Sequence, residues 1–311
     1  MFKRYWREYP WFLQVTLFGL MAFTMVSFAG FVLYTLMPIA TGYGIDKILG
    51  IDENSSAKLK SAFLWTQALS SVFTFLIPPV LFAYLTTPRV KEYLGLKVPA
   101  QPLHLLLGVL VMLGSMPVFI EIAASLKDIV PGTGEEKVEK VTKALLDIKT
   151  SGQLVQVLLV MALIPAIGEE LFFRGVLLRF AHQRMGRIVL PIIITSVLFS
   201  IVHNSIYNFL SIAMAGSLLC LIYYWSGSLL TSIVTHFVYN GAQIYLSYAS
   251  RNSEAMQQIA DAKHLPVSYV IGGLVVFTVS LYALWKTRKP LSPYWSANFS
   301  KEELAQQQTD V

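Results

Sequence analysis

Eight long apolar segments divide the chain, and they constrain its fold more than any other feature of the sequence. Each has about the 20 residues that a helix needs to cross a hydrocarbon layer of about 30 Å. Because lipid offers no hydrogen bonds to the backbone, each segment is predicted to be a helix. The expected spans are residues 11–37, 62–86, 103–125, 153–178, 188–207, 209–225, 228–248 and 267–285. The sequence therefore predicts an all-α fold, a polytopic membrane helical bundle with about eight transmembrane helices.

The composition agrees with a protein dissolved in lipid. Of the 311 residues, 55% are hydrophobic and 14% are charged, and the mean hydropathy is +0.59. Soluble domains contain about 25% charged residues. The net charge of +6 does not indicate a nucleic-acid partner, because the basic residues lie at the ends of apolar segments. There they anchor helices at anionic headgroups, so membrane lipids are the expected partners.

The chain is predicted to have three parts. Residues 1–152 carry spans one to three and a short amphipathic helix near 135–149, which is expected to lie on the membrane surface. Residues 153–248 carry spans four to seven, where the polar groups described below are found. Residues 249–311 carry the last span and a polar tail, which is expected to be poorly ordered from about Pro290.

The distribution of charge predicts the orientation in the membrane. With an even number of spans, both termini lie on the same side. The N-terminus, residues 87–102, residues 179–187 and the tail lie on that side, and each is net positive. The opposite loops, 38–61, 126–152 and 249–266, each balance to zero. Because basic loops stay in the cytoplasm, both termini are predicted to be cytoplasmic and the protein to lie in the cell (inner) membrane.

Charged residues inside the fourth span mark the candidate site. This span contains Glu169, Glu170 and Arg174, and each ionisable group in a membrane helix costs about 2.5–3.5 kcal/mol on insertion scales. Glu170 and Arg174 are four residues apart with the acid N-terminal, the order that favours an ion pair. Glu169 points about 100° away around the helix, so it is available for another role.

Two further spans place polar side chains at a matching depth. Span five contains His203, and span seven contains His236 and Asn240, one helical turn apart. At about 1.5 Å per residue, Glu170 and His203 lie about 22 and 27 Å from one membrane side. His236 and Asn240 lie about 15 and 21 Å from the same side. These groups are therefore predicted to line one cavity inside the bundle, although depth alone does not determine how each helix is rotated.

The chemistry that these groups suit is hydrolysis by an activated water molecule. An apolar pocket disfavours the charged form of a carboxylate and so makes it a stronger base. A histidine can share the proton of the water or bind a metal, and His236 and Asn240 can donate hydrogen bonds to an oxyanion. A protein nucleophile is not required, since Cys220 has no matching base, and the HExxH pair of the zincins is absent from the sequence.

Three groups of residues resemble, in order, the motifs of the CPBP family. These are the CAAX-processing and bacteriocin-processing intramembrane proteases, also called the Abi family. The matching residues are Glu169-Glu170-x-x-x-Arg174-Gly175, Phe199-x-x-x-His203 and His236-x-x-x-Asn240. The resemblance covers about residues 153–248 and implies an endopeptidase site buried in the bilayer, acting on peptides delivered from the membrane.

The resemblance also implies a role for each residue. Glu169 would activate the water together with His203. His236 and Asn240 would stabilise the oxyanion. The remaining two motif residues, which form the predicted ion pair, would orient the others.

The sequence leaves two questions open: whether a metal is bound, and which peptide is the substrate. The family is often described as metalloproteases, and Glu169, His203 and His236 could hold zinc with one open position. Asparagine is a poor zinc ligand, and a metal-free Glu–His mechanism fits the same residues and is slightly preferred. Eukaryotic members of the family cleave prenylated CAAX proteins, but another membrane-tethered peptide or a bacteriocin-like peptide is an equal candidate.

Two other classes of protein are alternatives. Intramembrane glutamate, arginine and histidine also build ion pathways in transporters, but the internal repeats that are frequent in transporters are not found in this sequence. A non-catalytic scaffold or immunity protein with the same fold would not require two adjacent carboxylates in lipid. Loss of peptide cleavage in a Glu169→Ala variant would distinguish a protease from both.

Overall fold

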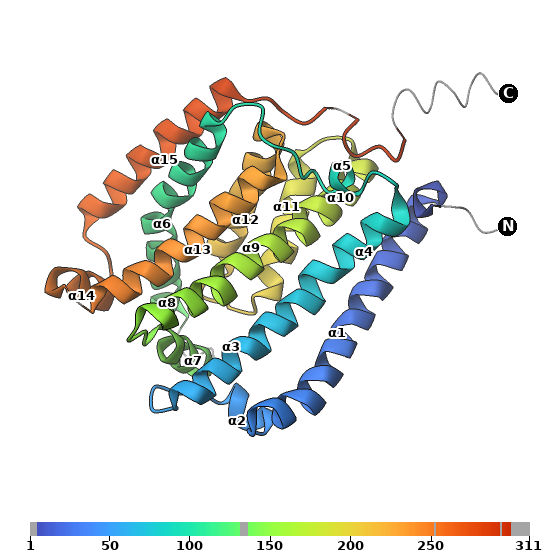
Figure 1. The fold of residues 1–311 in the computed structure, drawn as a ribbon. Coiled ribbons are helices and arrows are strands. Elements are labelled where there is room, and N and C mark those ends of the chain that lie inside the picture. Colours follow the sequence, from blue (N-terminus) through green and yellow to red (C-terminus); the bar gives the residue numbers. More distant parts are fainter. Residues whose placement is uncertain (1–4, 131–135, 252, 293, 300–311) are drawn as a thin grey trace, which may run out of the picture.

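The computed structural model describes residues 5–130, 136–251, 253–292 and 294–299, and within these ranges it contains helices and no strand. The predicted all-α class is confirmed (Figure 1). The long helical spans are built from α1 (Trp11–Thr41), α3 (Ala57–Ser71), η2 (Val72–Leu76), α4 (Ile77–Thr86), α6 (Leu103–Ile129), α8 (Ser151–Leu158), η3 (Leu159–Leu163), α9 (Ile164–Glu169), η4 (Glu170–Leu177), α10 (Leu178–Met185), α11 (Val189–Val202), α12 (Phe209–Ser226), α13 (Leu229–Ser250) and α15 (Val267–Thr287). Short helices join them: η1 (Trp6–Glu8), α2 (Ile45–Leu49), α5 (Val90–Tyr93), α7 (Glu136–Leu146) and α14 (Glu254–Asp261).

Most of the predicted spans are found as continuous apolar helices. Six in the described ranges are long and apolar enough to cross a membrane: Trp11–Thr41, Ala57–Thr86, Leu103–Ile129, Ser151–Met185, Phe209–Ser226 and Val267–Thr287. The other two predicted spans correspond to α11, with 14 residues, and α13, with 22. Helix α11 is short, and α13 is more polar than the others because it carries serine, threonine, histidine, asparagine and glutamine. The number of eight crossings is therefore approximate.

The predicted end of the fifth span, residue 207, is wrong. Helix α11 ends at Val202, and the chain turns over the following six residues before α12 begins. Asn204 adopts a left-handed conformation with φ of 49°, which asparagine tolerates better than most residues. The N–H groups of His203 and Asn204 bond to carbonyls three residues earlier and close the helix. Hydropathy missed this ending because the turn itself contains apolar residues.

Widened π-helical turns interrupt the second and fourth spans. Segment η2 lies just before Pro78, and η3 lies just before Pro165. A proline lacks the N–H donor, and its ring clashes with the carbonyl four residues earlier, so a wider turn relieves the clash. Segment η4 contains no proline but carries Glu170 and Arg174, and π-helical turns inside α-helices are frequent at functional sites.

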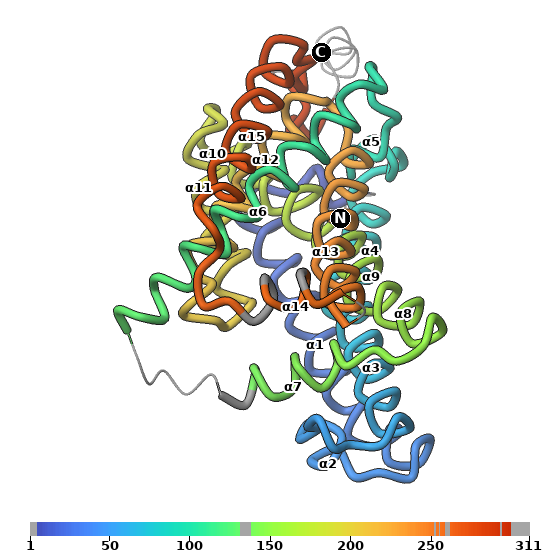
Figure 2. The backbone as a smooth tube through the Cα atoms, turned by 90° about the vertical axis from the view of Figure 1, so that its left-hand side faces the viewer, coloured from blue at the N-terminus to red at the C-terminus, as the bar shows by residue number. Residues whose placement is uncertain are grey.

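Helices α6 and α15 pack closely side by side, as both views show (Figures 1 and 2). Glycines on each helix make this approach possible. A Cβ atom at Gly114 would lie 2.6 Å from the backbone nitrogen of Phe277, and one at Gly273 would lie 2.8 Å from the Gly114 carbonyl oxygen. Small residues are typical of close contacts between membrane helices, so this pair determines how α15 attaches to the bundle.

The two ends of the bundle differ in what they contain. Figure 1 shows α2, α7, α8 and α14 gathered at the end drawn at lower left, which we call the distal end. At the other end, η1 meets the C-terminal residues, since Asn298 donates a hydrogen bond to the carbonyl of Arg7 at 3.1 Å. The amphipathic helix predicted near residues 135–149 is α7. Both ends of the described chain therefore lie on the same side, as an even number of crossings requires.

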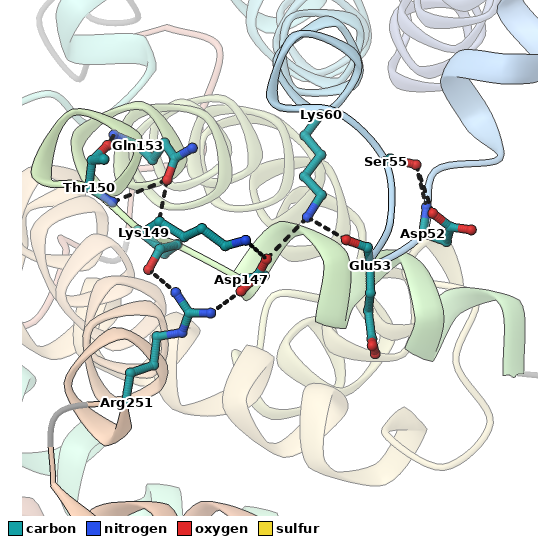
Figure 3. A network of polar contacts seen from close by, with 10 residues as sticks. Asp52, Glu53, Ser55, Lys60, Asp147, Lys149, Thr150, Gln153 and Arg251 are labelled. Atoms are coloured by element: carbon teal, nitrogen blue, oxygen red, sulfur yellow. Dashed lines mark hydrogen bonds and ion pairs between the residues drawn. The ribbon is translucent and has the colours of Figure 1, made fainter.

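An ion-pair network ties the distal end together. Asp147, in the connector between α7 and α8, lies 3.4 Å from Lys60 of α3 and 3.4 Å from Lys149, and it also pairs with Arg251 at the end of α13 (Figure 3). One carboxylate thus links three parts of the chain that are far apart in sequence.

Described residues of the C-terminal tail, between 294 and 299, bond to the fourth span, and residues 300–311 of the tail lie outside the described ranges. The buried guanidinium of Arg179 donates hydrogen bonds to the carbonyls of Trp295 and Ala297 at 2.7 and 2.6 Å. His182 and Ser296 bond at 2.8 Å. Because a buried guanidinium requires acceptors, the tail backbone completes the polar end of the fourth span.

Candidate active site

Glu170 and Arg174 are the two completely buried charged groups of the predicted site. One carboxylate oxygen accepts a hydrogen bond from the guanidinium of Arg174 at 2.7 Å and lies 3.0 Å from Nδ1 of His236. The other oxygen accepts a hydrogen bond from the hydroxyl of Ser232 at 2.6 Å. Arg174 also donates to the Gly216 carbonyl at 2.9 Å. The ion pair predicted from the i, i+4 spacing is present, and it lies behind the cavity wall.

Hydrogen bonding indicates which ring nitrogen of each histidine is free. Nδ1 of His236 faces a carboxylate, and Nδ1 of His203 lies 2.7 Å from the carbonyl oxygen of Phe199. Both partners can only accept, so each Nδ1 carries the hydrogen. In the neutral form of both rings, Nε2 then keeps a lone pair and can accept a proton.

Glu169 is placed differently from its neighbour. Its side chain reaches the cavity wall, and its Oε2 is buried with no hydrogen-bond partner among the described residues. That oxygen lies 3.9 Å from Nε2 of His236, a separation that a shared water molecule can bridge. The two glutamates therefore occupy distinct environments, as the rotation between adjacent helical positions predicts.

Phe199 joins the three motifs through its ring. The guanidinium carbon of Arg174 lies 4.6 Å from the ring centroid, a cation–π contact. The rings of His203 and His236 lie 4.6 and 6.0 Å from the same centroid. This buried phenyl group thus contacts a side chain from each of the other two motifs.

A cavity of about 720 Å³ brings the predicted residues together. Glu169, His203, His236 and Asn240 all line it, so the convergence predicted from depth is found. The cavity extends toward the distal end, where Leu145 of α7 contributes to its wall. Among the described residues, none from α5 or α10 lines it. The wall of the cavity thus runs from the middle of the bundle to the distal end.

The sequence reasoning did not find Ser232, which fixes Glu170. A signal for it was present. Ser232, His236 and Asn240 are spaced by four residues, which places them on one face of α13. A serine is common in membrane helices, so its spacing alone did not distinguish it from a packing residue.

The metal site considered from the sequence was Glu169, His203 and His236. Within the described ranges, no group of three or more His, Cys, Asp or Glu side chains is close enough together to hold a metal ion. The three side chains line one cavity without forming a ligand cluster. In this arrangement they do not fit a zinc site, and the mechanism below uses no step through a metal.

Comparison with known proteins confirms the resemblance predicted from the three motifs. Residues 151–242 match the model of the Rce1-like family, described as type II CAAX prenyl endopeptidase Rce1-like. The matched segment contains all six predicted site residues. No curated protein and no solved structure matches the chain. With six helices in the described ranges long and apolar enough to cross a membrane, the chain is a multi-pass integral membrane protein.

Proposed function

We propose that this chain, in which residues 151–242 are similar to the Rce1-like prenyl endopeptidase family, is an intramembrane endopeptidase. It cleaves a membrane-tethered peptide by attack of an activated water molecule. The observation that carries the proposal is the position of Glu169, which has an unpartnered carboxylate oxygen at a cavity wall, 3.9 Å from His236.

Hydrolysis requires a base, and Glu169 has that role. It takes one proton from a water molecule, whose oxygen attacks the carbonyl carbon of the scissile peptide bond. His203, with Nε2 as its acceptor atom, shares the proton of the water. When the C–N bond breaks, the leaving amine takes the proton from the carboxyl group of Glu169, so the base is restored.

The charge on the carbonyl oxygen needs donors, and α13 supplies them. His236 and the side-chain amide of Asn240 lie one turn apart on the same helix and both line the cavity. Asn240 donates through its side-chain amide, and His236 donates through Nε2 when its ring is protonated, because Nδ1 already donates to Glu170. Such a donor to the oxyanion contributes about 3–4 kcal/mol in other hydrolases. Glu170 holds the ring of His236 through Nδ1, and Arg174 and Ser232 hold Glu170 in turn.

The test is cleavage by the purified full-length protein in detergent or liposomes. Two fluorogenic probes distinguish the substrate classes: a peptide ending in a farnesylated CAAX-type sequence, and a hydrophobic peptide without a prenyl group. Glu169→Gln and Glu169→Ala should abolish cleavage of whichever probe is used. Cleavage at the wild-type rate in either variant would contradict the proposal. In cells, uncleaved membrane precursors should accumulate in the Glu169→Ala strain.

Metal content is measured on the same preparation. Metal-free chemistry by Glu169 and His203 predicts activity that survives chelation and a protein without stoichiometric zinc. Stoichiometric zinc that is lost, together with activity, in His203→Ala would instead support a metal mechanism. The charge distribution supports both termini in the cytoplasm of a cell whose inner membrane holds the protein.

A further inference from the structure

The cavity has a second polar wall, beside the α9–η4 segment that carries Glu169 and Glu170. It is formed by one face of α3 and η2, where Phe63, Gln67, Ser71 and Phe75 follow one another at four-residue spacing and Ser70 lies beside them. The span that contains them is otherwise apolar, with a mean hydropathy of 1.8. Three polar side chains on one face of such a span require a reason.

The polar groups of this wall lack hydrogen-bond partners among the described residues. The hydroxyl of Ser71 is buried without a hydrogen bond, and leaving a buried polar group unsatisfied costs about 1–3 kcal/mol. The side chain of Gln67 is exposed, and no hydrogen bond to another described residue occupies its amide. Both groups are therefore available to bond with something that enters the cavity.

Helix α13 supplies a matching set across the cavity. Beyond the catalytic Asn240, Gln243 lines the cavity one turn further toward the distal end. Its amide makes only a long contact of 3.5 Å with the Tyr239 carbonyl. Carboxamide side chains, which offer both a donor and an acceptor, thus face the cavity from α3 and from α13.

We propose that Gln67, Ser70, Ser71 and Gln243 form a subsite that binds the main chain of an extended peptide between the catalytic groups and the distal end. Positions four residues apart on a helix are separated by about 6 Å along its axis. In an extended peptide, groups that point to the same side recur every two residues, about 6.6 Å apart. Gln67 and Ser71 therefore match successive main-chain groups on one edge of such a peptide.

The chemistry of the subsite indicates what it recognises. Its polar members carry no charge, so main-chain amides rather than charged side chains are the complementary groups. The neighbouring Phe63 and Phe75 offer apolar contacts for the alternate side chains. The subsite therefore selects an extended, apolar peptide segment with little dependence on its detailed sequence. This inference rests on the proposed peptidase function.

Steady-state kinetics with the peptide that the protein cleaves test the subsite. Gln67→Met and Gln243→Met preserve side-chain length but remove the hydrogen bonds. Each loses about 1 kcal/mol of binding, so KM should rise about fivefold while kcat changes by less than twofold. Thr66→Val is the matched control, because Thr66 lies next to Gln67 but bonds only to the Ala62 carbonyl of its own helix. KM values for both glutamine variants equal to wild type would overturn the inference.

Peptides with single N-methylated backbone amides show whether the main chain is the partner. One N-methyl position should weaken binding to the wild type about fivefold but have no further effect on Gln67→Met, because the two changes remove the same hydrogen bond. Additive effects at every position would overturn the inference.

Binding can be measured without cleavage, using fluorescein-labelled versions of the two probe peptides and the Glu169→Gln variant with and without Gln67→Met. If wild type cleaves neither probe, the peptidase proposal fails. The subsite proposal fails separately if Gln67→Met leaves the affinity of the Glu169→Gln variant for the probe unchanged. Thermal unfolding of each variant confirms that it is folded.

Discussion

Glu170 and Arg174 bury opposite charges completely, each with a fully buried side chain. Such a pair is not in itself a large source of stability, because desolvation offsets much of the attraction. Once both partners are buried, however, removal of one leaves an uncompensated charge. Glu169 differs because its carboxylate reaches the cavity and has no buried cation to neutralise. Substitution of one glutamate should therefore affect mainly folding, and substitution of the other mainly the chemistry.

We predict that Glu170→Gln destabilises the fold by about 3–5 kcal/mol, since it leaves Arg174 buried and unpaired. Glu169→Gln should abolish cleavage with little change in stability. Thermal unfolding in detergent, followed by intrinsic tryptophan fluorescence, measures both effects. A Glu169→Gln variant as unstable as Glu170→Gln would contradict the separation of roles.

At the scale of helices, the α6–α15 contact depends on the absence of a Cβ atom at Gly114. Gly114→Ala should force the two helices apart and destabilise the protein by about 1–3 kcal/mol, a typical cost of overpacking. Gly272→Ala is the control, because nothing lies within 4 Å of a Cβ at that position. Comparison of the two unfolding temperatures tests the contact. Equal temperatures would show that α15 is not held in this way.

The Asp147 network joins α3, α13 and the α7–α8 connector at the distal end (Figure 3). Burial alone would raise the pKa of Asp147, but Arg251, Lys60 and Lys149 outweigh it and lower the pKa below its ordinary value. A carboxylate with a lowered folded-state pKa contributes stability that is present above its unfolded pKa of about 3.9. That contribution is lost as the pH falls through the lower, folded-state pKa.

Asp147→Asn should therefore destabilise the protein by about 1 kcal/mol at pH 7, the upper range for exposed ion pairs. At pH 3 the difference between variant and wild type should be smaller. Unfolding temperatures at the two pH values provide the measurement, with the exposed Asp46→Asn as a control. A difference that does not shrink in acid would contradict the role of the ionised carboxylate.

At the scale of the whole molecule, the wall of the cavity reaches the distal end at Leu145, whereas the ends of the described chain lie at the other end of the bundle. If the termini are cytoplasmic, as the charge distribution predicts, the distal end faces away from the cytoplasm. Entry from the distal end then admits a peptide presented on the outer face. If the termini lie outside, the distal end faces the cytoplasm, where CAAX-type proteins are found. Orientation therefore selects between the two substrate classes.

Cysteine labelling in intact cells measures this orientation. The one native cysteine, Cys220, is buried, and Cys220→Ala gives a background without thiols. A membrane-impermeant maleimide should label Gln243→Cys from outside, and should label Lys91→Cys of α5 only after permeabilisation. The reverse pattern would show that the predicted orientation is wrong.

Local patterns were sufficient to predict the helices and the convergence of polar side chains from three spans. Lipid offers no hydrogen bonds to the backbone, so the N–H and C=O groups of a long apolar segment must bond to one another, which requires a helix. The Glu170–Arg174 pair follows from positions four residues apart on one helix. Depth arithmetic placed His203, His236 and Asn240 in one layer because the rise per residue is nearly constant. The boundary at Val202 was missed because a turn inside the protein can remain apolar.

The sequence by itself thus determined the fold class, the three motifs and their shared depth, all of which depend on periodicity along single helices. Only the tertiary structure decided the rotation of each helix about its axis. That rotation brings Ser232 to Glu170 and directs the face of Gln67 and Ser71 into the cavity. The rotation of a helix is decided by packing against helices that are distant in sequence, such as the approach of Gly114 to α15. A hydropathy profile contains no information about such packing.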